Sequence, residues 1–279
     1  MTSTACDNGP YRVPHNPGPR SALTVPPTAG LLSMLSPGIP HARTAYGGVM
    51  PHYVPRVSAE RVEQLRRWHE DVSSELHARP TADIEYLGLQ LRVPRGVFAP
   101  TPTSDLLGNL VTDHATPGLR VLDMGCGAGA NAVLAARTGA TVLGVDVNPA
   151  AVEASRANAA RNGVADGTDF AVSDLFDAVE GDFDLVVIDP PFRWFSPRTM
   201  LERAFTDENY ATLTAFLHDV PGRLRPGGAV LLFFGTSGDV EYLDERISAN
   251  GLLSATVAER TITVRGELTT YFVRRLTIY

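Results

Sequence analysis

From residue 119 onward, short apolar runs alternate with stretches of helical character, and this alternation constrains the fold more than any other feature. We predict strands over residues 120–124, 141–146, 169–172, 185–189 and 229–234, with helices between them that include residues 131–138 and 149–162. Strands that alternate with helices form a parallel sheet with helices on both faces. Residues 185–188, Leu-Val-Val-Ile, are continuously apolar, as expected for a strand buried on both faces.

The end of the chain departs from this alternation. Residues 252–260 and 270–279 have strand character, no helix separates them, and the loop between them contains Gly266. An antiparallel hairpin at the sheet edge accounts for this pattern. The expected fold class is therefore α/β: a doubly wound, mostly parallel seven-stranded sheet with a C-terminal antiparallel hairpin, preceded by a helical and extended N-terminal segment.

Three regions are expected along the chain. Residues 1–57 hold ten of the 21 prolines and lack an apolar period, which predicts a Pro/Gly-rich arm that is disordered or loosely docked. Residues 58–115 are expected to form a helix from an N-cap at Ser58 to about His77, a strand over 84–93 around Gly88, and a helix over 104–112. Residues 116–279 are the predicted catalytic domain.

Composition excludes several classes of protein. All 24 basic residues are arginine, so lysine Schiff-base chemistry and a P-loop lysine are absent. Cys6 and Cys126 are too few for a disulfide scaffold. No run reaches the ~20 apolar residues of a membrane span, and residues 1–20 lack the apolar core of a signal peptide, so we expect a cytoplasmic enzyme. The histidines lack metal-ligand spacing; no metal is expected, and His69 and His77 are expected on a solvated helix face.

A glycine-rich loop follows the first predicted strand. Its sequence is Asp123-Met-Gly125-Cys-Gly127-Ala-Gly129, and glycines allow sharp turns and close approach of a ligand to the backbone. The Gly-x-Gly-x-Gly spacing differs from the Gly-x-Gly-x-x-Gly of dinucleotide enzymes. Asp123 beside the loop suits a ligand with an ammonium group better than a phosphate.

Acidic residues follow the next two predicted strands. Asp146 ends the second strand about 20 residues beyond the glycines, where a carboxylate can accept hydrogen bonds from ribose hydroxyls. Asp174 follows the third strand and could accept from an adenine amino group. Either acid could instead cap a helix. Three acids at the carboxyl ends of successive strands nevertheless favour a ligand site at that edge.

The fourth predicted strand ends in Asp189-Pro190-Pro191-Phe192. The Asp189 carboxylate and the Pro190 carbonyl offer two acceptors to an NH₂ group, and two prolines stiffen the turn that holds them. Phe192 can stack on a planar substrate. Trp194 then extends the aromatic surface, either to stack on a base or to pack on the sheet edge.

Residues 93–232 resemble the class I S-adenosylmethionine-dependent methyltransferases, and within them the small-domain group that includes release-factor glutamine methyltransferases and ribosomal-RNA guanine-N2 methyltransferases. The loop at 123–129 resembles the first motif of the family, Asp146 its ribose-binding acid and Asp174 its adenine-contacting acid. The segment at 96–100 resembles the one that precedes the first motif. Asp189–Phe192 resembles the motif of enzymes that methylate a nitrogen attached to a planar group.

The resemblance implies S-adenosyl-L-methionine as cofactor and a set of site residues. The catalytic residues would be Asp189, Pro190, Pro191 and Phe192, and the substrate-binding residues Phe98, Phe192 and Trp194. The cofactor-binding residues would be Thr103, Asp123, Gly125, Cys126, Gly127, Gly129, Asp146, Val147, Ser173, Asp174, Leu175 and Asp189.

The expected function is S-adenosylmethionine-dependent N-methylation, with a nucleobase in RNA or DNA as the favoured acceptor. The glutamine-acting branch carries asparagine where Asp189 stands, which favours an amino group over an amide. The net charge of −7 argues against a large nucleic-acid footprint, so a small molecule or peptide of secondary metabolism is the close alternative, beside a protein glutamine. A non-enzymatic cofactor binder and a nicotinamide-binding protein are the alternatives from other classes. The sequence leaves the oligomeric state open.

Overall fold

The structure, a computed structural model, describes residues 53–279, so the predicted arm over residues 1–57 lies almost wholly outside the described part of the chain. The residues described here all belong to one compact unit. The predicted boundaries at residues 57 and 115 stay predictions.

A seven-stranded sheet in the order β5-β4-β3-β6-β7-β9-β8 forms the centre of this unit. Its strands are β3 (Arg120–Met124), β4 (Thr141–Asp146), β5 (Thr168–Val172), β6 (Phe183–Ile188), β7 (Leu224–Gly235), β8 (Leu252–Val264) and β9 (Glu267–Ile278). Strands β3 to β7 are parallel to one another, and β9 is antiparallel to both β7 and β8. The expected α/β class, the mostly parallel sheet and the C-terminal hairpin are thereby confirmed.

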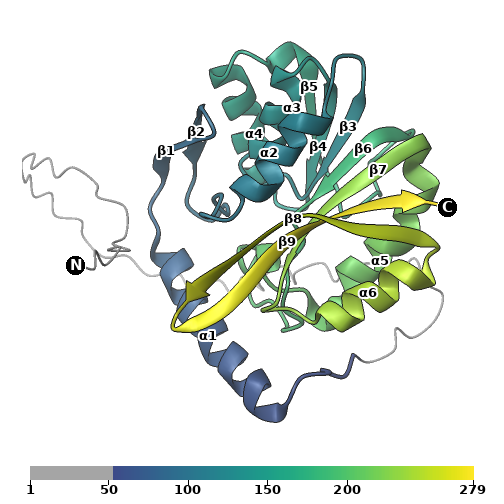
Figure 1. The fold of residues 1–279 in the computed structure, drawn as a ribbon. Coiled ribbons are helices and arrows are strands. Elements are labelled where there is room, and N and C mark those ends of the chain that lie inside the picture. The colour runs from purple at the N-terminus through teal and green to yellow at the C-terminus, as the bar shows by residue number, and fades with distance from the viewer. Residues whose placement is uncertain (1–52) are drawn as a thin grey trace, which may run out of the picture. The chain divides into compact units, whose positions relative to one another are not determined.

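Helices cover both faces of the sheet (Figure 1). On one face lie α2 (Asp105–His114), α3 (Ala130–Arg137) and α4 (Pro149–Arg161), and on the other α5 (Ala211–Asp219) and α6 (Val240–Ala249). The remaining helix, α1 (Ala59–Ala78), lies beside the tip of the β8–β9 hairpin. Short 3₁₀ turns occur at Ala165–Gly167, Glu202–Ala204, Glu208–Tyr210 and Val220–Arg223. The predicted helices are present to within a residue or two at each end.

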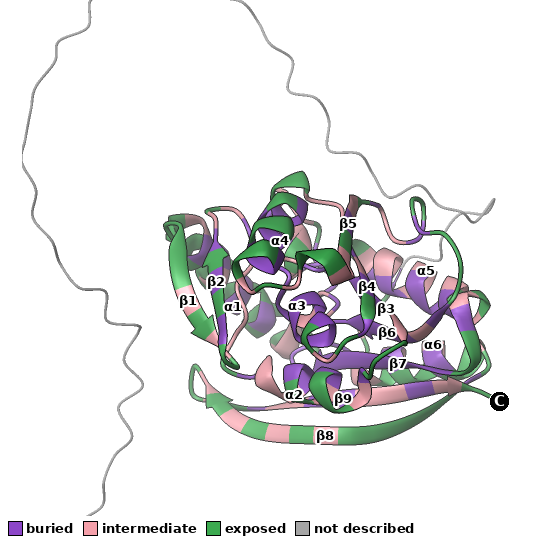
Figure 2. Cartoon of the chain, turned by 90° about the horizontal axis from the view of Figure 1, so that it is seen from above, coloured by how far each residue is buried: buried purple, intermediate pink, exposed green. Residues whose placement is uncertain are grey.

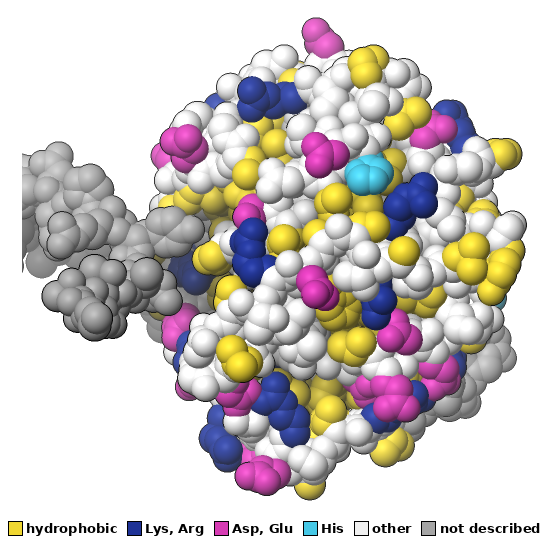
Figure 3. Space-filling view, viewed as in Figure 1, with side chains coloured by type: hydrophobic (Ala, Val, Ile, Leu, Met, Phe, Trp, Pro, Cys, Tyr) yellow, Lys and Arg dark blue, Asp and Glu magenta, His cyan; other side chains and the backbone are white. Residues whose placement is uncertain are grey.

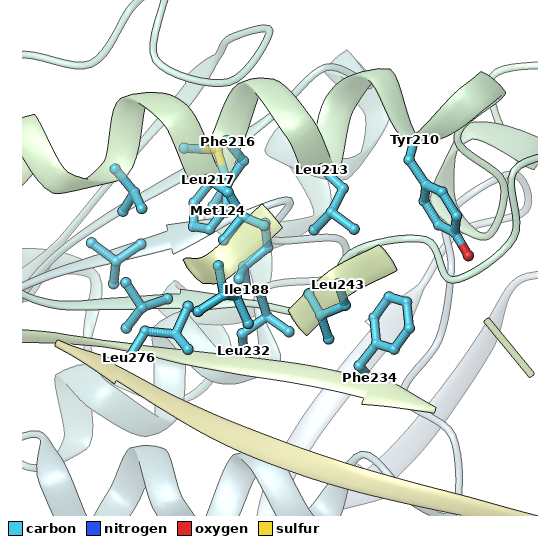
Figure 4. Packing of buried hydrophobic residues seen from close by; sticks show 14 of the residues in the cluster. Met124, Ile188, Tyr210, Leu213, Phe216, Leu217, Leu232, Phe234, Leu243 and Leu276 are labelled. Atoms are coloured by element: carbon cyan, nitrogen blue, oxygen red, sulfur yellow. The ribbon is translucent and has the colours of Figure 1, made fainter. Parts of the chain in front are cut away.

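The core lies between the sheet and these helices. On the α5 side, Met124 and Ile188 from the strands pack against Leu213 and Phe216 of α5 (Figure 4). Figure 2 shows burial concentrated in the central strands, whereas β8 is largely exposed along its length. Because β6 has helices on both sides, its last four residues are all buried, as its continuous apolar run predicts.

Residues 84–93 form two strands where the alternation predicts one. β1 (Ala82–Tyr86) and β2 (Leu89–Val93) pair antiparallel, with Tyr86 opposite Leu89. The two turn residues, Leu87 and Gly88, have φ of 46° and 75°. Tyr86 and Leu89 lie on one face of the hairpin, so the more buried positions change from even numbers (84 and 86) to odd numbers (89, 91 and 93). This change of phase marks the turn, and the prediction of a single strand overlooked it.

Two further predictions differ from the structure. Residues 224–228, which lie before the predicted strand over 229–234, already belong to β7, which pairs irregularly with β6 there: Phe183 lies opposite Leu224, but Leu185 lies opposite Ala229. The C-terminal hairpin is longer than expected and turns at Arg265 and Gly266. Within residues 53–279, no helix is long and apolar enough to span a membrane.

The extra length of the hairpin brings its tip to α1 (Figure 1). Arg265 at the tip pairs with Asp71 of α1 at 3.1 Å and also with Glu75, and Arg61 of α1 pairs with Glu267. Long-range charge pairs of this kind join the first helix to the last two strands. They place α1 over the carboxyl ends of the strands.

The histidines of α1 are not on a solvated face, contrary to expectation. His69 is only 4% exposed and its ring lies 5.5 Å from the rings of both Phe195 and Phe205. His77 is half-buried, and its Nε2 lies 3.1 Å from the Thr199 hydroxyl. Phe195, Thr199 and Phe205 belong to the segment after β6, which packs against this side of α1. The sequence pattern of α1 alone does not show that another segment packs there.

Candidate active site

A cavity of about 540 Å³ lies at the carboxyl ends of strands β3, β4, β5 and β6. It brings together most of the site residues predicted from the sequence. Those on its wall are Phe98, Thr103, Gly125, Cys126, Gly127, Asp146, Val147, Ser173, Asp174, Leu175, Asp189, Pro190, Pro191 and Phe192. Asp123, Gly129 and Trp194 are not on the wall. The location matches the general rule that parallel α/β sheets bind ligands at the carboxyl ends of their strands.

The glycine loop is held by bonds to the neighbouring strand and helix. The N–H groups of Gly125 and Cys126 both donate to the carbonyl of Val145, and the Ser155 hydroxyl of α4 donates to the carbonyl of Gly127. Gly129 has a φ of 82°, and a Cβ on it would lie 2.9 Å from the Ser155 Cβ. This position therefore requires glycine both for its backbone conformation and for its contact with α4.

Asp123 lies behind the glycine loop, and its side chain does not line the cavity. It is 2% exposed, and its Oδ2 accepts a hydrogen bond of 2.9 Å from the N–H of Ala132, the third residue of α3. Burial raises the pKa of its carboxyl to about 7. The predicted role as a direct partner of a ligand ammonium is replaced by a helix cap, because the Asp123 side chain extends toward the first turn of α3.

Asp146 combines a structural role with a place on the cavity wall. One carboxylate oxygen accepts from the N–H of Gly127 at 2.9 Å and the other from the N–H of Asn148 at 2.8 Å. Burial raises the pKa of its carboxyl above the usual value. Each oxygen takes one protein donor and therefore retains capacity for a ligand hydroxyl.

Asp174 lies on the cavity wall beside a cation. Arg203 pairs with it at 3.7 Å and also lines the cavity. Just before it, the Ser173 hydroxyl donates to the carbonyl of Leu175 and accepts from the N–H of Ala178. Leu175 has a φ of 49°, so these bonds hold a sharp turn at the end of β5.

Asp189 follows β6 and faces the cavity. Within residues 53–279, no hydrogen bond or ion pair satisfies its carboxylate. Burial raises the pKa of this carboxyl to about 7, and the charge of Asp123 adds to the rise. A carboxylate that lines the cavity without a protein donor is free to accept hydrogen bonds from a ligand there.

The turn that carries Asp189 is anchored behind the cavity. The hydroxyl of Tyr210, a residue with no exposed surface, donates to the carbonyl of Phe192 at 2.6 Å and accepts from the N–H of Asp239 at 2.8 Å. The Phe192 ring packs 5.0 Å from that of Phe234. Trp194 is 7% exposed and joins the core beside Tyr210, so it does not fill the predicted substrate-binding role.

One side of the cavity was not predicted from the sequence. It is lined by α1, by the tip of the hairpin and by the residue after Phe192, namely Trp68, Val72, Ile262, Val264, Arg265 and Arg193. For α1 and the hairpin, no signal in the sequence could have found these residues, because their place depends on contacts between elements some 200 residues apart. Arg193 could have been singled out by its position directly after the Asp189–Phe192 turn.

Comparison with known proteins places this geometry in context. Residues 89–243 match the family described as Methyltransferase small domain. A ribosomal protein L11 methyltransferase of Ralstonia pickettii is 37% identical over 174 residues, which are 62% of this chain and 49% of that protein. A release factor glutamine methyltransferase of Cereibacter sphaeroides is 32% identical over 167 residues, or 54% of this chain and 59% of that protein. The chain thus spans about half the length of these relatives.

Among solved structures, the chain is similar to the T. thermophilus 16S rRNA N2 G1207 methyltransferase RsmC in complex with AdoMet and guanosine. The TM-score is 0.51 at 26% identity, over 71% of this chain and 50% of that one. The family match covers more than half of the chain and includes the glycine loop, Asp146, Asp174 and the Asp189 turn. The chain therefore belongs to the methyltransferase small domain family.

Proposed function

We propose that this chain is an S-adenosylmethionine-dependent N-methyltransferase whose acceptor is an amino or amide nitrogen attached to a planar group. The observation that carries the proposal is the unsatisfied Asp189 carboxylate, which shares one cavity with the glycine loop and Asp146. A cytoplasmic location belongs to the same proposal.

The residues of the cavity fit the cofactor. At Gly125 the wall is bare backbone, since a Cβ built there would meet no atom within 4 Å, and the ligand can approach the main chain. Asp146 would accept from the ribose hydroxyls and Asp174 from the adenine amino group. When bound, S-adenosylmethionine supplies an electrophilic methyl group on a sulfonium: the new bond forms from the acceptor nitrogen to the methyl carbon, and the carbon–sulfur bond breaks.

The chain's own residues position the acceptor. The Asp189 carboxylate and the Pro190 carbonyl would each accept one N–H of the NH₂ group, which directs the nitrogen lone pair toward the methyl donor. The anchored turn keeps these two acceptors fixed before the substrate arrives. The proton that the methylated nitrogen loses passes to Asp189 or to solvent after transfer. Catalysis then depends mainly on orientation and on the oxygen acceptors.

A nucleobase amine is the favoured acceptor in this proposal. The similarity to RsmC, whose solved complex contains guanosine, supports it, as does aspartate at position 189, where the glutamine-acting branch carries asparagine. A glutamine amide is the second candidate, supported by the release factor glutamine methyltransferase among the relatives. A small molecule with an aromatic amine is the third.

A pair of substitutions tests the division of roles. Asp146→Ala should weaken S-adenosylhomocysteine binding at least tenfold, because a charged acceptor is lost. Asp189→Ala should change that affinity less than threefold yet lower turnover at least a hundredfold, an order typical for loss of a positioned polar group. Calorimetric titration with S-adenosylhomocysteine and transfer of a labelled methyl group to guanosine nucleotides, an RNA oligonucleotide and a glutamine-containing peptide measure both quantities.

Asp184→Ala is a matched control. Asp184 pairs with Arg225 at 2.8 Å outside the cavity, so its loss removes the same charge without touching the site. Equal loss of cofactor binding in Asp146→Ala and Asp189→Ala would refute the division of roles. A labelled methyl group found on carbon or oxygen would refute N-methylation itself.

A further inference from the structure

Arg193 is a buried cation that the methyl transfer described above does not use. Its side chain lines the cavity but is only 7% exposed, and its guanidinium carbon lies 4.4 Å from the centroid of the Trp68 ring of α1. Its Nε has no hydrogen-bond partner. Within residues 53–279, no carboxylate forms an ion pair with it.

The nearest charges do not neutralise Arg193. Burial lowers the pKa of its guanidinium to about 10, and the cations Arg265 and Arg61 contribute to the decrease. The acidic residues of α1 and the hairpin tip, Glu75 and Glu267, form ion pairs with other arginines: Glu75 pairs with Arg265, and Glu267 pairs with Arg61. Arg193 therefore remains charged at neutral pH in a place where an unpaired charge is expensive.

A ligand that supplies an anion would offset the free-energy cost of burying the unpaired charge of Arg193. Trp68 covers one side of the guanidinium, and a cation over an aromatic face keeps its N–H donors available at the edge of the plane. Those donors match the paired oxygens of a carboxylate or a phosphate. Arg193 directly follows the turn that carries Asp189, on the side of the cavity that α1 and the hairpin tip enclose.

We propose that Arg193 binds a carboxylate or phosphate group of the methyl acceptor, so that the substrate is a planar amine or amide that carries an anionic group. The inference rests on the proposed function, because it assumes that Asp189 holds the reacting nitrogen. The anionic group must enter the cavity to reach a residue this deeply buried. It therefore belongs to the reacting unit itself and not to a distant part of a larger partner.

Pairs of probes, each with one neutral and one anionic member, test this inference. In the presence of saturating S-adenosylhomocysteine, calorimetry compares guanosine with guanosine 5′-monophosphate, and 4-aminobenzamide with 4-aminobenzoate. We expect at least one anionic probe to bind about tenfold or more tightly than its neutral partner, as charge-assisted hydrogen bonds predict. Which pair shows the preference distinguishes phosphate from carboxylate. Arg193→Met should abolish the preference and leave affinity for the neutral probe unchanged.

Arg66→Met is the matched control. The guanidinium of Arg66 lies 5.1 Å from the Phe195 ring, so this variant loses the same charge and the same kind of aromatic contact, but outside the cavity. It should keep the full anion preference. A melting temperature of Arg193→Met close to that of Arg66→Met would show that the fold survives.

Two outcomes would overturn the inference while leaving the proposed function intact. One is wild-type protein that binds S-adenosylhomocysteine but shows no preference for either anionic probe. The other is Arg193→Met that loses affinity for S-adenosylhomocysteine, which would assign Arg193 to the carboxylate of the cofactor. Failure of the wild-type protein to bind S-adenosylhomocysteine would instead refute the proposed function and the inference with it.

Discussion

At the scale of single residues, the site depends on two carboxylates whose surroundings disfavour their charge. Burial raises the pKa of both Asp123 and Asp189 to about 7. Asp123 is compensated by the N–H of Ala132, whereas Asp189 has no hydrogen-bond donor among residues 53–279. The same rise in pKa therefore accompanies two different roles. Asp123 stabilises the start of α3, whereas Asp189 has acceptor oxygens available to a ligand.

Asp189→Asn should stabilise the fold, and more so at alkaline pH. The folded pKa of about 7 lies above the ordinary value of 3.8, so between these pH values the folded chain holds a proton that the unfolded chain has released. The stability of the wild-type protein accordingly falls as the pH rises through this range. Asparagine removes this titration. We expect the melting temperature of the variant to exceed that of the wild-type protein at pH 8, and the gain to disappear near pH 4.

Thermal unfolding followed by circular dichroism at several pH values measures this difference. Because the charge of Asp123 adds to the rise in the pKa of Asp189, the measured difference contains this interaction as well as the burial of Asp189. A variant less stable than the wild-type protein at pH 8 would show that Asp189 has a hydrogen-bonding partner within the folded chain.

At the scale of elements, the glycine loop connects β3 to α3 and packs against α4. Gly129 begins α3 with a φ of 82° and packs directly on Ser155 of α4, which in turn binds the carbonyl of Gly127. The loop therefore obtains its shape from three elements at once. A change at Gly129 should reach the cavity wall through Gly127, although Gly129 itself is not on that wall.

Gly129→Ala should lower both stability and cofactor affinity. The left-handed backbone costs about 1–2 kcal/mol for alanine, and the new Cβ would lie 2.9 Å from the Ser155 Cβ. Gly163→Ala supplies the comparison, because Gly163 has a φ of 73° but its Cβ would meet no atom within 4 Å. Urea unfolding should show the larger loss for Gly129→Ala, and S-adenosylhomocysteine titration should show weaker binding for that variant alone. Equal effects at the two glycines would contradict the contact with α4.

At the scale of the whole molecule, the charges are balanced locally rather than gathered into one basic surface. The chain carries a net charge of −7, and Figure 3 shows arginine and acidic side chains interspersed over the face in view. Many arginines of the described residues pair with acids, as Arg260 does with Asp105 and Arg274 with Asp244. The proposed function accordingly places recognition of the acceptor inside the cavity.

Acceptor binding should consequently depend only weakly on salt. A footprint of 6–10 phosphates gives a steep slope of log affinity against log salt concentration, whereas a ligand held mainly at one buried arginine gives a slope below about 2 in magnitude. Fluorescence titration of a guanosine-containing RNA oligonucleotide between 50 and 200 mM salt, roughly the range over which such footprints lose most affinity, measures the slope. A slope near −6 would indicate an extended nucleic-acid surface that the mixed charges do not predict.

Local patterns were sufficient for the sheet and for the cofactor side of the site. The strands at Arg120–Met124 and Thr141–Asp146 match the predicted ranges, because their apolar runs end at glycine or a capping residue. Asp146 and Asp189 lie in one cavity because the carboxyl ends of parallel strands meet at one edge. The hairpin at β1–β2 was missed because the apolar alternation of its two strands was treated as continuous, although its phase changes at Leu87 and Gly88.

The sequence by itself determined the alternation of the parallel strands with helices, the glycine loop and the acids at the strand ends, since each depends on neighbours within a few residues or on the general geometry of parallel sheets. Only the tertiary structure decided that Asp123 caps α3, that Trp194 is buried in the core, and that α1 and the hairpin tip close the acceptor side around Arg193. These features depend on pairs such as Arg265 with Asp71, far apart in the chain, whose proximity follows from the packed fold and not from any local pattern.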